Sequence, residues 1–576
     1  MRDMNFCKRI KLLLGAVALS SASASALELN YNLDNLNLQA QSTYLYDFPF
    51  KGEDFGDYEK LYTFEHADTV TQKHGFDISG RKYNLPKTKW SRLKGDVDES
   101  KNENRAGYNK PIYAMRDGVV AACWRSAPEN PRVKNNSDYK VDEQGEYLLD
   151  EKGNWISKDE REWIHWRLRD HSTRSIPKAG NHLIIQHDDG TYALYAHMIP
   201  GTIPFELCPR NASTFVEAGI YSAPEDDWPT VTGISPTRTY PLRVEKGQRI
   251  GRMGNSGEST GPHLHVHVAK GPIGDAVAEP IKFKRGMVSL LDHDDPYGDW
   301  QSFKGSVIPT NISENGILVW APRSLSAQYV RHGFASPGFS ALFDHLSDSG
   351  FKLSWFDGFT SGSTTRYNQI WKPADTYWRA YSRKTSSGYQ SVFNQAKADG
   401  YVPVHVDSYN TPYGVRYAAI FEKKSMSYIA RHGLTYQEHM NTYNEAKSKG
   451  MSPVSISVVS TGGQRRYTVL YHKKYIGAWS IRSQMTSSQY NQTYADMKAA
   501  NKYPVYLNAY MHDGTAYYTA VFASKPVSNA VGAKHGLTAS GFQSYYNSYS
   551  SLNYLTSLIA GLDGYGATRY AGVWRR

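Results

Sequence analysis

Cysteine is scarce in this chain, and long apolar runs are absent beyond its first residues. Of 576 residues only three are cysteines: Cys7, Cys123 and Cys208. After the N-terminus no stretch reaches the roughly 18 apolar residues of a membrane-spanning helix, which excludes a transmembrane segment. No Cys follows the first apolar run at a position for lipid attachment, so soluble export is expected rather than a lipid anchor.

The N-terminus has the pattern of a secretory signal peptide. Basic residues precede an apolar run and a small-residue cleavage site: Lys8, Arg9 and Lys11, then 12–19, then Ala24-Ser25-Ala26. We therefore expect residues 1–26 to be removed and the protein to be secreted or periplasmic. Cys123 and Cys208 then remain, and two cysteines in an exported protein most simply form one disulfide.

Length and charge divide the mature chain into two parts. A chain of 576 residues is too long for one hydrophobic core, since single cores stop growing near about 250–300 residues. Residues 321–576 hold 27 Lys and Arg against 12 Asp and Glu, a net charge of +15, whereas residues 27–320 carry about −7. This basic part suggests attraction to an anionic envelope polymer, with no nucleic acid expected as a partner. Charge that only keeps a large surface soluble is the alternative.

The basic part consists of five tandem repeats of about 50 residues. Helical stretches such as 389–398 and 436–448 end at Gly400 and Gly450, and a β segment follows each glycine. A fixed period of this length predicts α+β units that bury a shared core between neighbours. A Tyr marks each repeat at spacings of 50, 50, 51 and 52 residues: Tyr367, Tyr417, Tyr467, Tyr518 and Tyr570.

These units resemble a bacterial tandem-repeat domain that occurs beside serine hydrolases of the polyglycine-hydrolase type and in other exported proteins. The resemblance implies a binding or docking module over residues 321–576, without chemistry of its own. Histidines mark three of the five repeat starts, at His332, His432 and His535. Because the other two starts lack them, these histidines are interpreted as structural.

The pattern that points to chemistry lies in the first part, where histidines alternate behind a Gly-rich turn. From Gly254 to Val268 the chain reads GNSGESTGPHLHVHV, so His263, His265 and His267 would point to one face of a strand. A row of imidazoles on a rigid element is what a zinc site needs, and the close turn would admit a substrate backbone. Hydrogen-bonded histidines in a half-buried strand are the plainer alternative.

This stretch resembles the signature of the LytM/lysostaphin-type zinc endopeptidases, which cut peptidoglycan cross-links. Further segments at 111–120, 180–198 and 244–251 are similar to the family's motifs and follow in its order. The resemblance implies a mainly β, LytM-like peptidase domain with an antiparallel sheet over residues 27–320. Insertions at 125–178 and 209–240 would frame its cleft and set substrate choice.

The resemblance also implies roles for individual histidines. In the family the first His of the HLH motif is catalytic and the second binds zinc, which implies His263 and His265. The family's second catalytic imidazole follows Tyr-Ala, which implies His197. His182 and His187, in the same hairpin, are interpreted as framework residues.

The remaining zinc ligands match the family less closely. Its first motif is His-x-Gly-x-Asp, with both His and Asp on the metal, whereas this chain reads Lys73-His74-Gly75-Phe76-Asp77. Asp77 fits, but Lys73 occupies the position of the His. The third ligand would be His66, which is slightly favoured, or His74, one residue out of register. A broken site that binds no metal is the alternative.

Two His, one Asp and an open position are the pattern of a catalytic zinc site. Zn²⁺ would activate water and polarise the scissile carbonyl, while His197 and His263 handle the proton and the oxyanion. The resemblance thus implies a secreted zinc metalloendopeptidase that cleaves peptide cross-links of bacterial peptidoglycan. Two alternatives stay open: a degenerate, non-catalytic binding or scaffold protein, and an exported peptidase that acts on Gly-rich protein.

Overall fold

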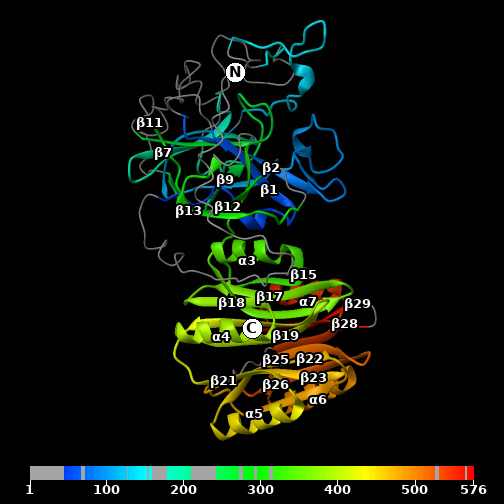
Figure 1. Ribbon diagram of the computed structural model, residues 1–576. Helices are drawn as coiled ribbons and strands as arrows, with labels where there is room; N and C mark the ends of the chain where they lie inside the picture. The colour runs from blue at the N-terminus through cyan, green and yellow to red at the C-terminus, as the bar shows by residue number, and fades with distance from the viewer. Residues whose placement is uncertain are drawn as a thin grey trace, which may run out of the picture.

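The computed structural model places most of the chain in two bodies, which Figure 1 shows one above the other. It describes residues 45–65, 72–125, 127–151, 155–158, 178–208, 242–270, 277–290, 295–310, 316–525, 531–564 and 567–576. The expected signal peptide, residues 1–26, and the insertion at 209–240 lie outside the described residues. Within the described ranges, no helix is long and apolar enough to cross a bilayer.

The upper body is built on one antiparallel sheet of twelve strands, as expected for its fold class. Ten strands follow the order β13-β12-β14-β1-β2-β10-β7-β6-β5-β8, with β3 beside β2 and β11 beside β10. A separate two-stranded sheet pairs β4 with β9. The strands are β1 (Glu59–Glu65), β2 (Phe76–Asn84), β3 (Lys89–Ser91), β4 (Pro111–Tyr113), β5 (Gly118–Trp124), β6 (Asn181–Gln186), β7 (Thr191–Met198), β8 (Arg243–Val244), β9 (Arg249–Arg252), β10 (Leu264–Lys270), β11 (Val277–Glu279), β12 (Phe283–Ser289), β13 (Gln301–Ser306) and β14 (Ile317–Trp320).

The central strands β2 and β10 have one apolar and one polar face. Ile78 and Val266 are fully buried in the main core of the sheet. Their neighbours Asp77 and His265 must point to the opposite face, because successive side chains of a strand alternate. The apolar face therefore anchors the sheet, and the polar face is free to carry chemistry.

A disulfide joins Cys123 on β5 to Cys208 in the segment after β7, as expected from the cysteine count. Both cysteines are completely buried. The bond ties the strand pair β5–β6 to the chain that follows His197, the last residue but one of β7.

The lower body consists of five repeats, each with a three-stranded antiparallel sheet and one helix, which confirms the expected α+β units. The strand that closes the hairpin lies in the middle of each sheet. The repeats contain β15 (Tyr329–Ala335), α3 (Phe339–Asp348), β16 (Phe351–Ser361) and β17 (Thr364–Pro373); β18 (Trp378–Lys384), α4 (Ser386–Ala398), β19 (Tyr401–Thr411) and β20 (Gly414–Lys423); β21 (Tyr428–Leu434), α5 (Tyr436–Ser448), β22 (Ser452–Thr461) and β23 (Gln464–His472); β24 (Trp479–Met485), α6 (Ser487–Ala499), β25 (Tyr503–His512) and β26 (Thr515–Ala523); β27 (Val531–Leu537), α7 (Ala539–Ser551), β28 (Leu555–Gly564) and β29 (Ala567–Arg575).

Local sequence explains where the repeat helices begin and end. The side chain of Thr435 caps the N-terminus of α5 and forms a capping box with Glu438, and Thr486 does the same for α6 with Gln489. After α5 the chain turns at Gly450, whose φ of 64° favours glycine. The predicted helix 436–448 agrees with α5.

The five repeats form a closed ring. Strands β16, β19, β22, β25 and β28 lie side by side in that order, and β28 returns to contact β16. Similar bonds occur at four junctions between neighbouring repeats, where a side chain accepts a hydrogen bond from the backbone of the repeat before it. These bonds are Gly358 N to Asp407 Oδ2 (2.9 Å), Ser408 N to Ser457 Oγ (3.0 Å), Val458 N to Asn508 Oδ1 (3.0 Å) and, across the seam, Gly561 N to Asp357 Oδ2 (2.9 Å).

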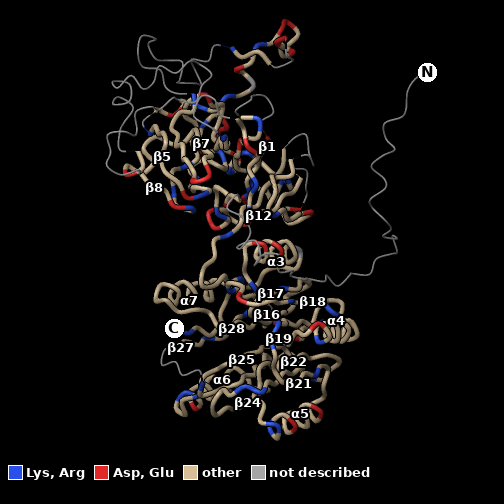
Figure 2. The backbone as a smooth tube through the Cα atoms, turned by 90° about the vertical axis from the view of Figure 1, so that its left-hand side faces the viewer, with Lys and Arg blue, Asp and Glu red and all other residues tan. Residues whose placement is uncertain are grey.

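Helix α3 joins the ring to the upper body. His345 of α3 stacks on Trp320 of β14, with ring centroids 4.2 Å apart. The carboxylate of Asp348 pairs with Lys304 at 2.8 Å. Figure 2 shows α3 between the two bodies, so the first repeat positions the sheet on the ring.

Asp407 makes ring stability depend on pH. Burial raises the pKa of this carboxyl to about 7 and raises that of its buried neighbour Asp357 as well. The folded state therefore keeps protons that the unfolded state releases above about pH 4, and stability falls as pH rises from about 4. We predict that Asp407→Asn makes this slope shallower, since repeat 4 already has Asn508 at the equivalent position, and that Asp357 maintains the remainder. Hydrogen exchange of the β16 and β19 amides at pH 5 and 8 measures it.

The exposed Asp513, at the tip of the β25–β26 hairpin, provides the matched control. Asp513→Asn should leave the pH dependence of exchange unchanged. An equal slope in wild type and Asp407→Asn would contradict the assignment.

Candidate metal and catalytic site

Asp77 and His265 face each other across the β2–β10 pair. They are register partners, and Asp77 Oδ1 lies 2.9 Å from His265 Nδ1. The same oxygen is 3.5 Å from His263 Nε2, at the end of the Gly-rich turn. A carboxylate oxygen thus lies close to two imidazole nitrogens, and oxygen and nitrogen atoms of these kinds are both zinc ligands in proteins.

His197 reaches this cluster through an irregular backbone. Its neighbour Ala196 is the register partner of His265 and shares its face, so a regular strand would turn His197 to the opposite face. Instead His197 has a φ of 65°, in the left-handed region that few non-glycine residues adopt. Its ring centroid is 4.7 Å from that of His263 and 6.2 Å from that of His265. Strain of this kind clusters at functional sites.

Backbone carbonyls fix the tautomers of His197 and His263. Nδ1 of His197 lies 2.8 Å from the carbonyl oxygen of Ser256, and Nδ1 of His263 lies 2.8 Å from that of Gly261. A carbonyl oxygen can only accept, so each Nδ1 donates. In the neutral form each Nε2 then carries the lone pair that can take a proton or bind a cation.

Burial keeps His197 neutral. Desolvation is the largest cause that lowers its pKa well below the usual value, and the nearby His263 and His265 lower it further. Asp77 acts in the opposite direction. The imidazole is therefore available as a base at neutral pH.

His267 continues the histidine row beneath the cluster. Its Nδ1 is 2.8 Å from Nε2 of His265, so a hydrogen-bonded chain runs from His267 through His265 to Asp77. Gly75 makes room for it, because a Cβ on residue 75 would stand 3.0 Å from the Cβ of His267. The alternating histidines were evident in the sequence, but this contact with Gly75 was not.

Buried polar side chains hold the Gly-rich turn in place. The hydroxyl of Ser256 donates to the carbonyl oxygen of Met198, and the amide of Asn130 donates to the carbonyls of Gly257 and Ser259, at 2.8–3.0 Å. Neither role was evident from the sequence.

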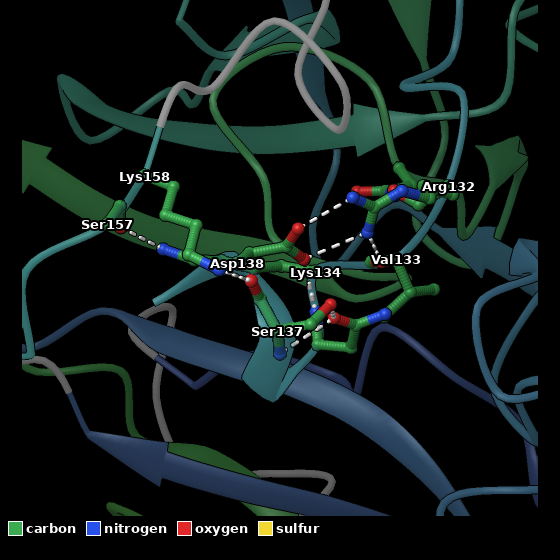
Figure 3. Close-up of polar contacts among 9 residues, drawn as sticks. Arg132, Val133, Lys134, Ser137, Asp138, Ser157 and Lys158 are labelled. Carbon is green, nitrogen blue, oxygen red and sulfur yellow. Dashed lines mark hydrogen bonds and ion pairs between the residues drawn. The ribbon is translucent and has the colours of Figure 1, made fainter. Parts of the chain in front are cut away.

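The segment after Asn130 is braced by an ion pair. The terminal nitrogens Nη1 and Nη2 of Arg132 donate to the carboxylate of Asp138, at 2.8 and 2.6 Å (Figure 3). Nearby, Lys158 Nζ donates to the carbonyl of Ser137 at 2.8 Å. The backbone of Lys134 in turn donates to the carbonyl of Thr260 in the turn. The first insertion is thereby attached to the loop that carries His263.

The third ligand is the part of the expected site that the described residues leave open. His66 lies outside the described residues. His74 is directed to the surface, where its Nδ1 is 3.2 Å from Glu65 Oε1. Among the residues described, no group of three or more His, Cys, Asp or Glu is arranged to hold a metal ion. Asp77 and His265 have side-chain donor atoms of the types that bind zinc.

His182 and His187 lie away from the cluster as framework residues. Both are buried, and their Nδ1 atoms are 2.9 and 2.8 Å from the carbonyls of Gly180 and Asp117. Burial lowers the pKa of His182 to about 4.

Solved structures similar to the chain include peptidases of the type that its motifs resemble. One is the catalytic domain of a mutant of the prophage-encoded M23 protein EnpA from Enterococcus faecalis, at 14% identity over 42% of this chain and 90% of that chain, with a TM-score of 0.16. Another is the antimicrobial peptidase lysostaphin from Staphylococcus simulans, at 12% identity over 66% and 92%, with a TM-score of 0.18. The SpoIIQ–SpoIIIAH pore-forming complex is similar at 11% identity over 41% and 89%, with a TM-score of 0.17.

The lower body has a family match of its own. No curated protein matches the chain. A family model described as "Polyglycine hydrolase-like, structural repeat" matches five times, at residues 326–374, 376–424, 425–474, 476–525 and 528–576. These matches coincide with the five sheets and their helices. The ring is therefore an array of five polyglycine hydrolase-like structural repeats, as the sequence resemblance implied.

Proposed function

We propose that this protein is a secreted zinc metalloendopeptidase that cleaves peptide cross-links of bacterial peptidoglycan. The observation that carries the proposal is the convergence of Asp77, His197, His263 and His265 on one face of the sheet. These residues come from β2, the end of β7, the Gly-rich turn and β10. A left-handed backbone at His197 completes the cluster.

Asp77 and His265 would hold the zinc with a third protein ligand. Of the two candidates, His74 already pairs with Glu65 at the surface, which favours His66. Zinc, when bound, would supply Lewis acidity at the scissile carbonyl. The remaining chemistry falls to side chains of this chain.

His197 and His263 suit proton transfer and oxyanion stabilisation. Their donating Nδ1 atoms are fixed on backbone carbonyls, so each presents Nε2 in a fixed orientation. The neutral His197 suits the acceptor of the proton of the attacking water, because its Nε2 carries the lone pair. Stabilising the developing oxyanion requires an Nε2–H, so the other imidazole, His263, would fill that role in its protonated form.

His267 would set the tautomer of His265. A cation between Asp77 and His265 Nδ1 requires the proton of that imidazole to sit on Nε2. His267 Nδ1, 2.8 Å away, can accept that proton in a hydrogen bond. Such contacts orient a ligand and raise its basicity.

A degenerate, non-catalytic scaffold is the second candidate function. It is favoured by the lack of a three-ligand group among the described residues and by Lys73 in place of the expected His. A Gly-rich protein as substrate is a variant of the first proposal, suggested by the repeats' family description. Digesting purified wall and a Gly-rich protein side by side separates these substrates.

The repeats would dock the enzyme on its substrate. Residues 321–576 carry a net charge of +15, and exposed lysines such as Lys473, Lys474 and Lys525 lie on the ring. Positive charge of this extent attracts anionic polymers over a distance set by ionic strength. The proposed partner is an anionic envelope polymer, peptidoglycan included.

We predict that the mature chain binds about one zinc. His265→Ala and Asp77→Asn should abolish binding because each removes a ligand, and the loss caused by His66→Ala or His74→Ala identifies the third. Metal analysis after dialysis at neutral pH is the measurement. His432→Ala in the ring, hydrogen-bonded to Ser386, is the control and should keep its zinc. A zinc-free wild type would leave the scaffold as the function.

We predict that His197→Asn and His263→Ala keep zinc and lose cleavage by roughly 10²–10⁴-fold, the usual contribution of general acid–base groups. Asn is chosen at residue 197 because it tolerates a positive φ. Rates of wall digestion, with zinc content measured on the same samples, provide the test. Full activity in both variants would contradict the assigned roles.

We predict that a chain lacking residues 322–576 still cleaves small soluble peptides but acts less on whole wall. Sedimentation with isolated wall at low and high salt should reveal salt-sensitive binding of the full chain, since exposed charges are screened beyond about 8 Å at physiological ionic strength. Replacing Lys473, Lys474 and Lys525 by Gln should weaken binding, and the same change at exposed Lys89, Lys101 and Lys270 should not. Equal binding without the repeats would refute docking.

A further inference from the structure

The strand that carries Asp77 also carries a buried arginine on the same face. Asp77, Ser79 and Arg81 alternate along β2, so their side chains share the face on which the histidines converge. Arg81 is only 5% exposed, which is unusual for an arginine.

The guanidinium of Arg81 points back along the strand toward Asp77. Its Nη1 donates to the hydroxyl of Ser79 at 3.1 Å, and its Cζ lies 3.7 Å from the ring centroid of Tyr62. Tyr62 is the register partner of Ser79. The charge therefore sits near the level of Ser79, two residues or about 7 Å along the strand from Asp77.

Two more arginines lie close enough to act on the charge of Arg81. Arg92 and Arg105 both repel Arg81 and, after burial, help to lower its pKa. Their segment folds back on itself, with Leu93 bridging Arg105, and its Gly107 packs on Gly80, on the face of β2 opposite to Arg81. Arg92 is exposed and connects the cluster to solvent.

In the part of the chain that the structure describes, Arg81 forms no ion pair with a carboxylate. Its polar contacts are with Ser79, the carbonyl of Gly80 and the side chain of Tyr62, while Glu99 acts on the charge of Arg105. An uncompensated buried charge is costly, and guanidinium groups bind carboxylates in a matched two-point geometry. The cluster is thus built to receive an anion.

We propose that Arg81, with Arg92 and Arg105, binds a carboxylate of the substrate peptide one or two residues from the scissile bond. A separation of about 7 Å is the span of two residues in an extended chain. The proposal rests on the proposed function, because it takes Asp77 to mark the scissile bond. Either a C-terminal or a side-chain carboxylate offers this chemistry.

The test measures binding rather than cleavage, in the full mature chain with His263→Ala to block turnover. Three N-acetylated pentapeptides are titrated by calorimetry. Two share one Gln-containing sequence and end in a free carboxylate or a carboxamide, and the third is the carboxamide with Glu in place of that Gln. We expect a preference of about tenfold for at least one carboxylate peptide over the neutral one, the usual size of a charged hydrogen bond. The preferred peptide identifies the source of the carboxylate.

Arg81→Gln should reduce that preference to less than twofold while leaving binding of the neutral peptide unchanged. Arg243→Gln, an exposed arginine on the edge strand β8, is the matched control and should keep the full preference. Arg81→Lys keeps the positive charge and should retain part of the carboxylate preference. Thermal melting confirms that each variant is folded.

Equal binding of all three peptides, binding of none, or a preference that survives Arg81→Gln would each overturn the proposal. The proposed function fails separately, through absent zinc and absent cleavage in the unblocked chain. A carboxylate preference in a chain that neither binds zinc nor cleaves peptides would indicate a peptide-binding scaffold with the same subsite.

Discussion

The register of β2 against β10 is the constraint on which the candidate site depends. Directly opposed residues of an antiparallel pair hold their Cβ atoms about 4.5–5.5 Å apart, and here the opposed residues are Asp77 and His265. A slip of one residue would place an apolar side chain in their position and turn Ile78 and Val266 out of the core. The hydrophobic effect on one face of the sheet therefore fixes the ligand geometry on the other.

His197 obeys a different constraint, because strand geometry alone would direct it away from the cluster. The left-handed backbone that redirects it is held by neighbours on both sides. Asn181 donates to the carbonyl of Met198, and Ser256, whose carbonyl accepts from His197, donates to that same carbonyl. Rigid packing around an unfavourable conformation is how a fold places a side chain that regular structure cannot.

These two cases explain how much the sequence could predict. Alternation and period are local properties, so the shared face of His263, His265 and His267 and the five repeats could be inferred. The disulfide followed from the count, because two cysteines remain after the expected signal peptide. The positive φ of His197 left no signal in its own residue type. The same holds in the ring, where Gly333, Gly433 and Gly536 have positive φ values that Arg383 and Gln484 share at equivalent positions, without a glycine to mark them. Closure of the ring and the cluster around Arg81 depend on contacts between residues far apart in sequence, which no local pattern records.

The seam of the ring joins two repeats that both carry a histidine. Five is an odd number, and the His-Gly pair of the first strand occurs in repeats 1, 3 and 5, so two such repeats, 5 and 1, are neighbours at the seam. There His332 contacts Phe542 and Tyr570 of repeat 5, and Trp355 donates to the carbonyl of Ile559.

Because the ring of repeats is closed, it has no free end that could contact the upper body. The contact is instead made by a helix on the outside of the ring. Eight of the ten residues of α3 are buried, against one residue of α6. Ala341 of α3 packs with Met287 and Trp320 of the upper sheet, where a solvent-facing helix would be polar. The apolar character of α3 is therefore what turns a self-contained ring and a self-contained sheet into one molecule.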